Sequence, residues 1–259
     1  MPRLLVRVQH GPPVWGLQGG EVRNLVLLPE KGNAVFVGDT HGDLFASRLV
    51  CKNYAKHGYY LVFLGDYIDR GKDSRANIEY LLAFQKEYPK LILLAGNHEM
   101  SPRIPVTPSD FWDNLSPEEA EHFFSEFSLF PLAVSGKGFL AVHAGLPDIK
   151  THEEWDSFKD GSTQWARVLW ADFREKPGDV LGTFLGRPKL GADYFTRVMD
   201  QLGKAFLIRS HDPKAPEVMY QGRCLTIFTS SYYSDTRTIA LVNLEKGATH
   251  VNDVELITF

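Results

Sequence analysis

Three short apolar runs, each ending abruptly in glycine and in acidic or histidine residues, constrain the fold of this chain most strongly. The runs are Ala34–Val37, Tyr60–Leu64 and Leu91–Leu94. They lack the alternation of a half-exposed strand, which is typical of strands buried on both faces of a sheet. Ser74–Tyr88 has apolar residues at helical spacing and is followed by Pro89, so we expect a crossover helix there. Such strand–loop–helix repeats bring the loops together at one edge of the sheet.

The rest of the chain indicates one further helix and a second sheet. Ser116–Glu119 has the spacing of a capping box with proline at the first helical position, which predicts a helix through about Phe127. Six later apolar runs predict a mostly antiparallel sheet: Leu132–Val134, Phe139–Val142, Ala205–Ile208, Glu217–Tyr220, Cys224–Thr229 and Thr238–Leu244. We therefore expect an α/β fold in which two sheets form a β-sandwich flanked by helices. With no repeat or linker evident, residues 1–259 are predicted to form a single domain.

The three loops after the first strands supply carboxylate, imidazole, amide and guanidinium groups. They read Gly38-Asp39-Thr40-His41-Gly42-Asp43, Gly65-Asp66-Tyr67-Ile68-Asp69-Arg70-Gly71 and Gly96-Asn97-His98-Glu99. Asp39 and His41 are two residues apart and project to the same side of an extended backbone. Each motif alone is weak, because Gly-Asp after a strand is commonly a turn with an Asx hydrogen bond. Their joint occurrence at three strand ends favours one shared site.

Two later strands also end in functional side chains, His143 in one case and the pair Arg209 and His211 in the other. Aspartate, histidine and asparagine ligands without cysteine suit manganese, iron or zinc. The loops and strand ends offer six such ligands, which is more than one catalytic ion can bind while it keeps positions open for water or substrate. A bridging carboxylate would instead let two ions share the site. The remaining histidines lack a strand-end context and are interpreted as surface or packing residues: His10, His57, His122, His152 and His250.

From about Val35 to Tyr233, the order of these motifs resembles the PPP family of serine/threonine protein phosphatases, within the calcineurin-like metallophosphoesterase superfamily. Leu169–Asp172 is similar to the family's Leu-Trp-x-Asp segment. The resemblance implies two divalent metal ions, manganese first, with iron or zinc as alternatives. It implies two ligand sets that share Asp66, the first being Asp39, His41 and Asp66 and the second being Asp66, Asn97, His143 and His211.

The same resemblance implies the roles of the remaining site residues. Arg70 and Arg209 would bind the phosphate oxygens, with Asn97 and Tyr233 also on the substrate side, and His98 would be the general acid, oriented by Asp69. The implied activity is hydrolysis of phosphoserine and phosphothreonine in proteins. Hydroxide bound by the two metal ions would attack phosphorus directly.

Some residues depart from the family pattern. Ala144 replaces the second residue of the usual His-Gly-Gly, and His-Ala-Gly also occurs in symmetric diadenosine tetraphosphate hydrolases, which makes a dinucleotide polyphosphate the alternative substrate. Glu99 favours the protein phosphatases, since those hydrolases usually carry aspartate there. A shift of one residue would put Tyr232 in the place of Tyr233. A scaffold without chemistry is disfavoured because all the ligand positions are retained.

Composition excludes other classes of partner. A net charge of −4 without a basic stripe argues against nucleic acid, and no apolar run approaches the roughly 20 residues of a membrane span. Met1–Gln9 lacks the apolar core of a secretory signal, so we expect a cytoplasmic protein. Cys51 and Cys224 are predicted to be unpaired thiols. Arg237–Phe259 is too short for an autoinhibitory extension, and the pattern identifies no regulatory subunit.

Overall fold

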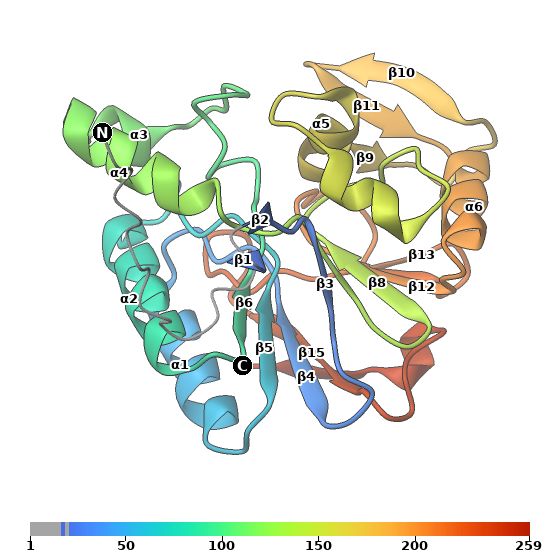
Figure 1. The fold of residues 1–259 in the computed structure, drawn as a ribbon, viewed down its shortest axis with the longest axis horizontal. Coiled ribbons are helices and arrows are strands. Elements are labelled where there is room, and N and C mark those ends of the chain that lie inside the picture. The colour runs from blue at the N-terminus through green and yellow to red at the C-terminus, as the bar shows by residue number, and fades with distance from the viewer. Residues whose placement is uncertain (1–16, 19–20) are drawn as a thin grey trace, which may run out of the picture.

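The computed structural model describes residues 17–18 and 21–259. Two β-sheets lie face to face, with helices α1 and α2 at the left and α5 and α6 at the right of the view (Figure 1). The predicted α/β sandwich is therefore confirmed. Met1–Gln9 and His10, which were considered above, lie outside the described residues.

The first sheet contains the three strands that the sequence predicts. Its order is β16-β15-β4-β5-β6, with β4 at Asn33–Val37, β5 at Tyr60–Phe63, β6 at Leu91–Leu93, β15 at Thr238–Asn243 and β16 at Glu255–Thr258. β4, β5 and β6 are parallel, and Val37 pairs with Phe63, which pairs with Leu93. The loops that follow these strands therefore leave the sheet at the same level.

The second sheet differs from the prediction. Its order is β13-β14-β12-β8-β7-β3, with β3 at Leu25–Leu27, β7 at Ala133–Ser135, β8 at Phe139–Val142, β12 at Phe206–Arg209, β13 at Val218–Met219 and β14 at Cys224–Thr226. The predicted mostly antiparallel sheet is wrong, because β8, β12 and β14 run parallel. The long segment between β8 and β12, which includes α5 and α6, provides the crossover that parallel strands require.

The last predicted strand also belongs elsewhere. β15 pairs antiparallel with β4 in the first sheet, with Ile239 opposite Val37. It covers an edge of the parallel strands that would otherwise expose unpaired backbone groups.

Helices and smaller sheets surround the two large sheets. The α-helices are α1 at Leu44–Ala55, α2 at Ser74–Glu87, α3 at Asp110–Asp113, α4 at Pro117–Phe127, α5 at Thr163–Trp170 and α6 at Ala192–Gln201. The 3-10 helices are η1 at His152–Ser157 and η2 at Val251–Asp253. β1 at Leu17–Gln18 pairs with β2 at Glu21–Val22, and a second small sheet combines β9 at Asp172–Phe173, β10 at Val180–Phe184 and β11 at Arg187–Leu190. Within residues 17–18 and 21–259, none of the helices combines the length and the apolar character needed to cross a bilayer.

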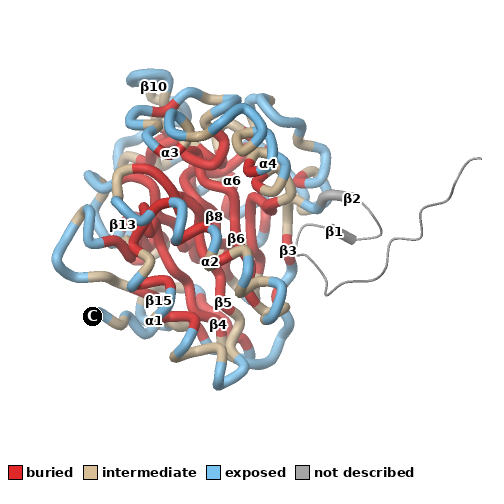
Figure 2. The backbone as a smooth tube through the Cα atoms, turned by 90° about the vertical axis from the view of Figure 1, so that its left-hand side faces the viewer, coloured by how far each residue is buried: buried red, intermediate tan, exposed pale blue. Residues whose placement is uncertain are grey.

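The alternation of side chains explains why the strands are apolar throughout. In β4, Ala34 and Phe36 face the interior of the sandwich, whereas Val35 and Val37 belong to the cluster that includes the helices. Phe36 meets Phe139 of the opposite sheet edge to face, with ring centroids 5.6 Å apart. Buried backbone runs through the centre of the molecule (Figure 2). Both faces are therefore buried, as the sequence predicts.

The predicted capping box is present at the start of α4. The hydroxyl of Ser116 accepts a hydrogen bond from the backbone N–H of Glu119 at 3.2 Å, and the carboxylate of Glu119 accepts one from the N–H of Ser116 at 2.9 Å. Phe123 and Phe127 of this helix belong to the hydrophobic core. Cys51 and Cys224 are buried free thiols, which confirms that prediction.

We expect Ser116→Ala to lower the free energy of unfolding by about 1 kcal/mol, because it leaves a helix N-terminal N–H without its acceptor. Urea denaturation measures the change. Ser125→Ala on the same helix is the matched control, since the Ser125 hydroxyl caps nothing and contacts only the carbonyl of His122. Equal losses in the two variants would contradict a specific role for the cap.

Candidate functional site

The ends of parallel strands from both large sheets meet at one site. Asp39, Asp66 and Asn97 follow β4, β5 and β6, while His143 and His211 follow β8 and β12. All five side chains belong to buried residues. An isolated parallel bridge between Asp39 and Phe228 joins the loop after β4 to the segment after β14. The tertiary fold thus brings together residues from both halves of the chain.

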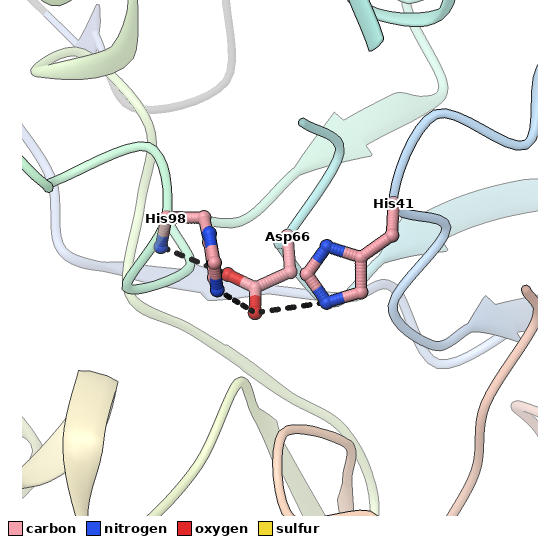
Figure 3. Close-up of side chains that lie close together, drawn as sticks. All are labelled: His41, Asp66 and His98. Atoms are coloured by element: carbon pink, nitrogen blue, oxygen red, sulfur yellow. Dashed lines mark hydrogen bonds and ion pairs between the residues drawn. The ribbon is translucent and has the colours of Figure 1, made fainter. Parts of the chain in front are cut away.

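Two groups of buried side chains place their donor atoms close enough to hold metal ions. One is His41, Asp66 and His98, and the other is Asp66, His143 and His211, with the donor atoms in each lying within 4.8 Å of one another. Figure 3 shows the carboxylate of Asp66 between the rings of His41 and His98. Asp66 belongs to both groups, which is the geometry of a shared ligand.

Backbone carbonyls orient two of the histidine rings. Nδ1 of His41 donates to the carbonyl of Ile68 and Nδ1 of His143 donates to the carbonyl of Leu64, each at 2.8 Å, which is the tautomer we infer from the acceptors. Nε2 of His143 then presents a lone pair 2.9 Å from Oδ1 of Asn97 and 3.5 Å from Oδ1 of Asp66. Three acceptor atoms that face one another fit a cation between them, and outer carbonyls commonly orient ligating histidines in this way.

Asp39 adds a second indication of bound cations. Among the described residues, its Oδ2 is one of the buried side-chain atoms without a hydrogen-bond partner. Burial, followed by the charge of Asp66, raises the pKa of Asp39 to about 7. Two carboxylates buried side by side are unfavourable as anions unless positive charge compensates them. The oxygen and nitrogen donors therefore fit divalent cations such as manganese, iron or zinc.

The geometric grouping differs from the first ligand set that the resemblance implies. It includes His98 where the resemblance has Asp39. Nε2 of His41 lies 3.6 Å from Oδ2 of Asp66 and 3.7 Å from Oδ2 of Asp39, while Nε2 of His98 lies 4.0 Å from Oδ2 of Asp66. Asp39 and His98 thus border the same space beside His41 and Asp66. They differ in that His98 has a carboxylate partner of its own.

The carboxylate partner of His98 is Asp69, and residues of a third segment hold this pair in place. Nδ1 of His98 lies 2.6 Å from Oδ2 of Asp69, while Oδ1 of Asp69 accepts from the N–H of Phe111 at 2.7 Å. The indole of Trp112 donates to the carbonyl of His98 at 2.9 Å. Phe111 and Trp112 belong to the short helix α3, which sequence reasoning missed because four residues leave little periodic signal. α3 therefore fixes the orientation of the pair.

Burial also shifts the pKa values of His98 and Asp69. It lowers the pKa of His98 to about 4 and raises the pKa of Asp69 to about 7. In both groups burial is the largest cause, because it disfavours the charged form. Burial therefore favours the neutral form of each group.

Two arginines and a tyrosine border the groups from different elements. Nη1 of Arg70 lies 3.0 Å from Nε2 of His41 and also contacts the hydroxyl of Tyr233. That hydroxyl lies 2.9 Å from Nε2 of His41, whereas the ring of Tyr232 is exposed. Arg209 is fully buried and donates to Oγ1 of Thr226, but its Nη2 has no partner among the described residues. A buried guanidinium with an unused donor fits an anion.

Backbone conformation at the site is unusual. Five of its non-glycine residues lie in the left-handed region: His41, Asp66, Asp69, Arg70 and His211, with φ of 42°, 55°, 65°, 67° and 77°. Each such residue costs of order 1–3 kcal/mol, and such costs cluster at functional sites. Gly65, at φ 103°, also needs its lack of a side chain, because a Cβ there would lie 2.6 Å from the backbone of Gly96. The site therefore depends on the packing around it.

Glu99 is a site residue whose role sequence reasoning missed. Its buried carboxylate accepts hydrogen bonds from the N–H groups of Gly96 at 3.0 Å and of Asp66 and Tyr67 at 2.8 Å. It thus ties the loop after β6 to the loop after β5. Its position in Gly-Asn-His-Glu was the only signal, and that signal did not reveal what the carboxylate contacts.

Arg187 is the second residue that the sequence did not single out. It lies on β11, where Nη2 contacts Nε2 of His211 at 2.7 Å and also Asp172, and its guanidinium lies over the ring of Trp170 at 5.4 Å. Arg174 contacts the same aspartate at 3.3 Å. The Leu-Trp-x-Asp segment thus reaches the site through Asp172, but the sequence of β11 carries no motif that would reveal Arg187.

Known proteins similar to this chain include serine/threonine-protein phosphatases. A probable serine/threonine-protein phosphatase of Encephalitozoon cuniculi is 27% identical over 232 residues, covering 83% of this chain and 50% of that protein. Serine/threonine-protein phosphatase T of Aspergillus oryzae is 30% identical over 220 residues, covering 77% of this chain and 45% of that protein. The chain thus spans about half the length of the curated relatives it matches.

Solved structures agree on the fold. A protein serine/threonine phosphatase from Saccharomyces cerevisiae superimposes with a TM-score of 0.69 at 20% identity, covering 92% of this chain and 83% of that one. A putative diadenosine tetraphosphatase gives a TM-score of 0.55 at 16% identity, covering 91% of this chain and 98% of that one. The sequence profile of the calcineurin-like phosphoesterases matches residues 33–215, which is most of the chain. The chain therefore belongs to the calcineurin-like phosphoesterase family.

Proposed function

We propose that this protein hydrolyses phosphoserine and phosphothreonine monoesters in proteins, using two divalent cations. The observation that carries the proposal is the pair of buried donor groups that share Asp66, bordered by Arg70 and by the unpaired donor of Arg209. The names of the relatives support the choice of a phosphoprotein substrate. We propose manganese as the metal, with iron or zinc as alternatives, because the donors are oxygen and nitrogen.

Two sets of residues would hold the cations. We assign Asp39, His41 and Asp66 to the first, and Asp66, Asn97, His143 and His211 to the second. Asp39 is preferred to His98 as a ligand because its Oδ2 accepts no hydrogen bond from the described residues, whereas Nδ1 of His98 already contacts Asp69. When bound, such cations activate water as a nucleophile and offset the charge of the phosphate.

The arginines position the phosphate group. Arg70 and Arg209 approach it from opposite halves of the chain, and planar guanidinium groups match pairs of phosphate oxygens. Tyr233 contacts both Arg70 and His41, so it holds this arginine near the first cation position. Donors already fixed in place stabilise the charge that develops on the equatorial oxygens without a cost of reorganisation.

His98 is proposed to protonate the departing seryl or threonyl oxygen. Its Nδ1 contacts Asp69, so the ring is fixed and Nε2 faces the carboxylate of Asp66. An alkoxide is a poor leaving group, so donation of a proton at this atom lowers the barrier. Asp69 keeps the ring oriented and stabilises its protonated form.

We expect His98→Asn to reduce kcat on a phosphothreonine peptide by about 10²- to 10⁴-fold, the usual contribution of general acid catalysis. The loss on an aryl phosphate should be smaller, because that leaving group departs without a proton. Steady-state kinetics with both substrates measure the difference, and His57→Asn, at an exposed histidine, is the control. Equal losses on the two substrates would contradict the assignment.

We expect Asp66→Asn to weaken the binding of both cations, because it removes the shared anionic ligand. Loss of a residue that only orients a ligand costs about 10- to 100-fold in metal affinity, and we expect a larger loss here. Asparagine tolerates the left-handed backbone at this position, so the loop should keep its shape. Titration of the metal-free protein with manganese, followed by elemental analysis, measures the effect. Asp73→Asn, at an exposed residue, is the control. Two tightly bound ions per chain in Asp66→Asn would refute the bridging role.

Turnover of diadenosine tetraphosphate, compared with a phosphothreonine peptide at the same manganese concentration, tests the substrate class. The proposal requires higher kcat/KM for the peptide. A strong preference for the dinucleotide would replace the phosphoprotein substrate and leave the assignment of the cation ligands unchanged.

A further inference from the structure

Two adjoining hollows beside the site take no part in the roles described above. One has a volume of about 450 Å³ and begins at His41, and the other, of about 370 Å³, extends along α1 to Lys52. Both are lined by Leu44, Phe45 and Asp73, so the two hollows adjoin at the start of α1 and together make up one surface region. We call it the α1 groove and define it by Phe45, Arg48, Lys52, Lys72, Tyr232 and Arg237.

The α1 groove carries exposed aromatic side chains next to the phosphate-binding side of the site. Phe45 is 62% exposed and Tyr232 is 54% exposed. The guanidinium of Arg70 lies over the ring of Tyr232 at 5.8 Å, while that of Arg237 lies over Phe45 at 5.4 Å. A ligand whose phosphate reaches Arg70 can therefore pass over Tyr232 and onto Phe45.

Positive charge predominates in the α1 groove, although the whole chain has a net charge of −4. Asp43 is already neutralised, because its carboxylate accepts from the N–H groups of Ala46 and Ser231 and from Nε of Arg237. Across the described part of the chain, Lys52 and Lys72 form no ion pair. Asp73 is the remaining acidic side chain. The net positive charge of the α1 groove therefore favours an anionic ligand.

The spacing of the cations matches an extended peptide. Arg48 and Lys52 are one helical turn apart, a rise of about 6 Å along α1. In an extended chain, alternate side chains point the same way about 6.5–7 Å apart. Two acidic residues separated by one position can therefore meet Arg48 and Lys52, while an apolar residue two positions away from this pair, on the same side of the extended chain, packs on Phe45.

We propose that the α1 groove is a substrate subsite that binds acidic residues flanking the phosphorylated serine or threonine. The subsite rests on the proposed phosphatase activity and adds to it a class of substrate, namely phosphopeptides with a flank that is acidic and carries an apolar residue.

The test compares two phosphothreonine peptides that differ only in the flank, which contains aspartate in one and lysine in the other. A small aryl phosphate has no peptide flank, so its hydrolysis reports on the phosphate-binding site without any contribution from the α1 groove. The wild-type protein should favour the acidic peptide by about 3- to 10-fold in kcat/KM, mainly through KM, as expected for a few exposed ion pairs. The preference should shrink as sodium chloride is raised, because salt screens exposed charges.

The double variant Arg48→Glu with Lys52→Glu should abolish or invert the preference and leave the aryl phosphate kinetics unchanged. Lys56→Glu is the matched control, since Lys56 is exposed at the end of the same helix but does not line the α1 groove. Circular dichroism checks that the helix is intact. Phe45→Ala should raise KM for the acidic peptide without changing aryl phosphate turnover.

Different failures point to different errors. Equal kcat/KM for both peptides in the wild-type protein, or a preference that survives the double variant, would overturn the subsite alone. Absence of hydrolysis of every phosphoester with manganese present would overturn the proposed function together with the subsite. If Phe45→Ala impaired only diadenosine tetraphosphate turnover, the α1 groove would be a nucleobase site instead.

Discussion

Asp66 is the residue on which the arrangement of the site depends. Its carbonyl accepts from the N–H groups of Thr40 at 3.1 Å and His41 at 2.9 Å, and its Oδ1 accepts from the N–H of His98 at 3.0 Å. Its own N–H donates to Glu99 at 2.8 Å. One residue thus connects the loops after β4, β5 and β6, and its carboxylate belongs to both candidate metal groups. A displacement of Asp66 would disturb all three loops at once.

The site concentrates unfavourable features that the rest of the fold must offset. Buried carboxylates lie close together, histidine lone pairs face acceptors, and several residues adopt the left-handed backbone. The apolar interior of the sandwich, with Phe36 against Phe139, supplies a rigid support, and α3 and Glu99 hold the loops from outside. Bound cations would stabilise this arrangement further, since a ligand that binds only the folded state adds its binding free energy to stability.

Sequence reasoning was most successful where a pattern is local. The apolar runs, the capping box at Ser116 and the order of the strand-end motifs were all readable, and they led to the two-sheet fold and to the candidate ligands. It failed for the partner of the strand Thr238–Asn243, because an antiparallel strand can pair with either sheet and its own residues do not specify which. It also missed Arg187, α3 and the role of Glu99, because all three act through contacts with residues distant in the chain.

The sequence by itself determined that three buried strands end in Asp39 and His41, in Asp66 and in Asn97, because strand burial and loop chemistry are local properties of the residues. The resemblance already assigned His143 and His211 to the same site, but only the tertiary structure brings their donor atoms from the other sheet next to Asp66, since that meeting requires the two sheets to pack face to face. It also decided that Tyr233 contacts Arg70 while Tyr232 is exposed beside the α1 groove. The physical reason is that long-range packing, rather than neighbouring residues, sets which side chain enters a buried polar site.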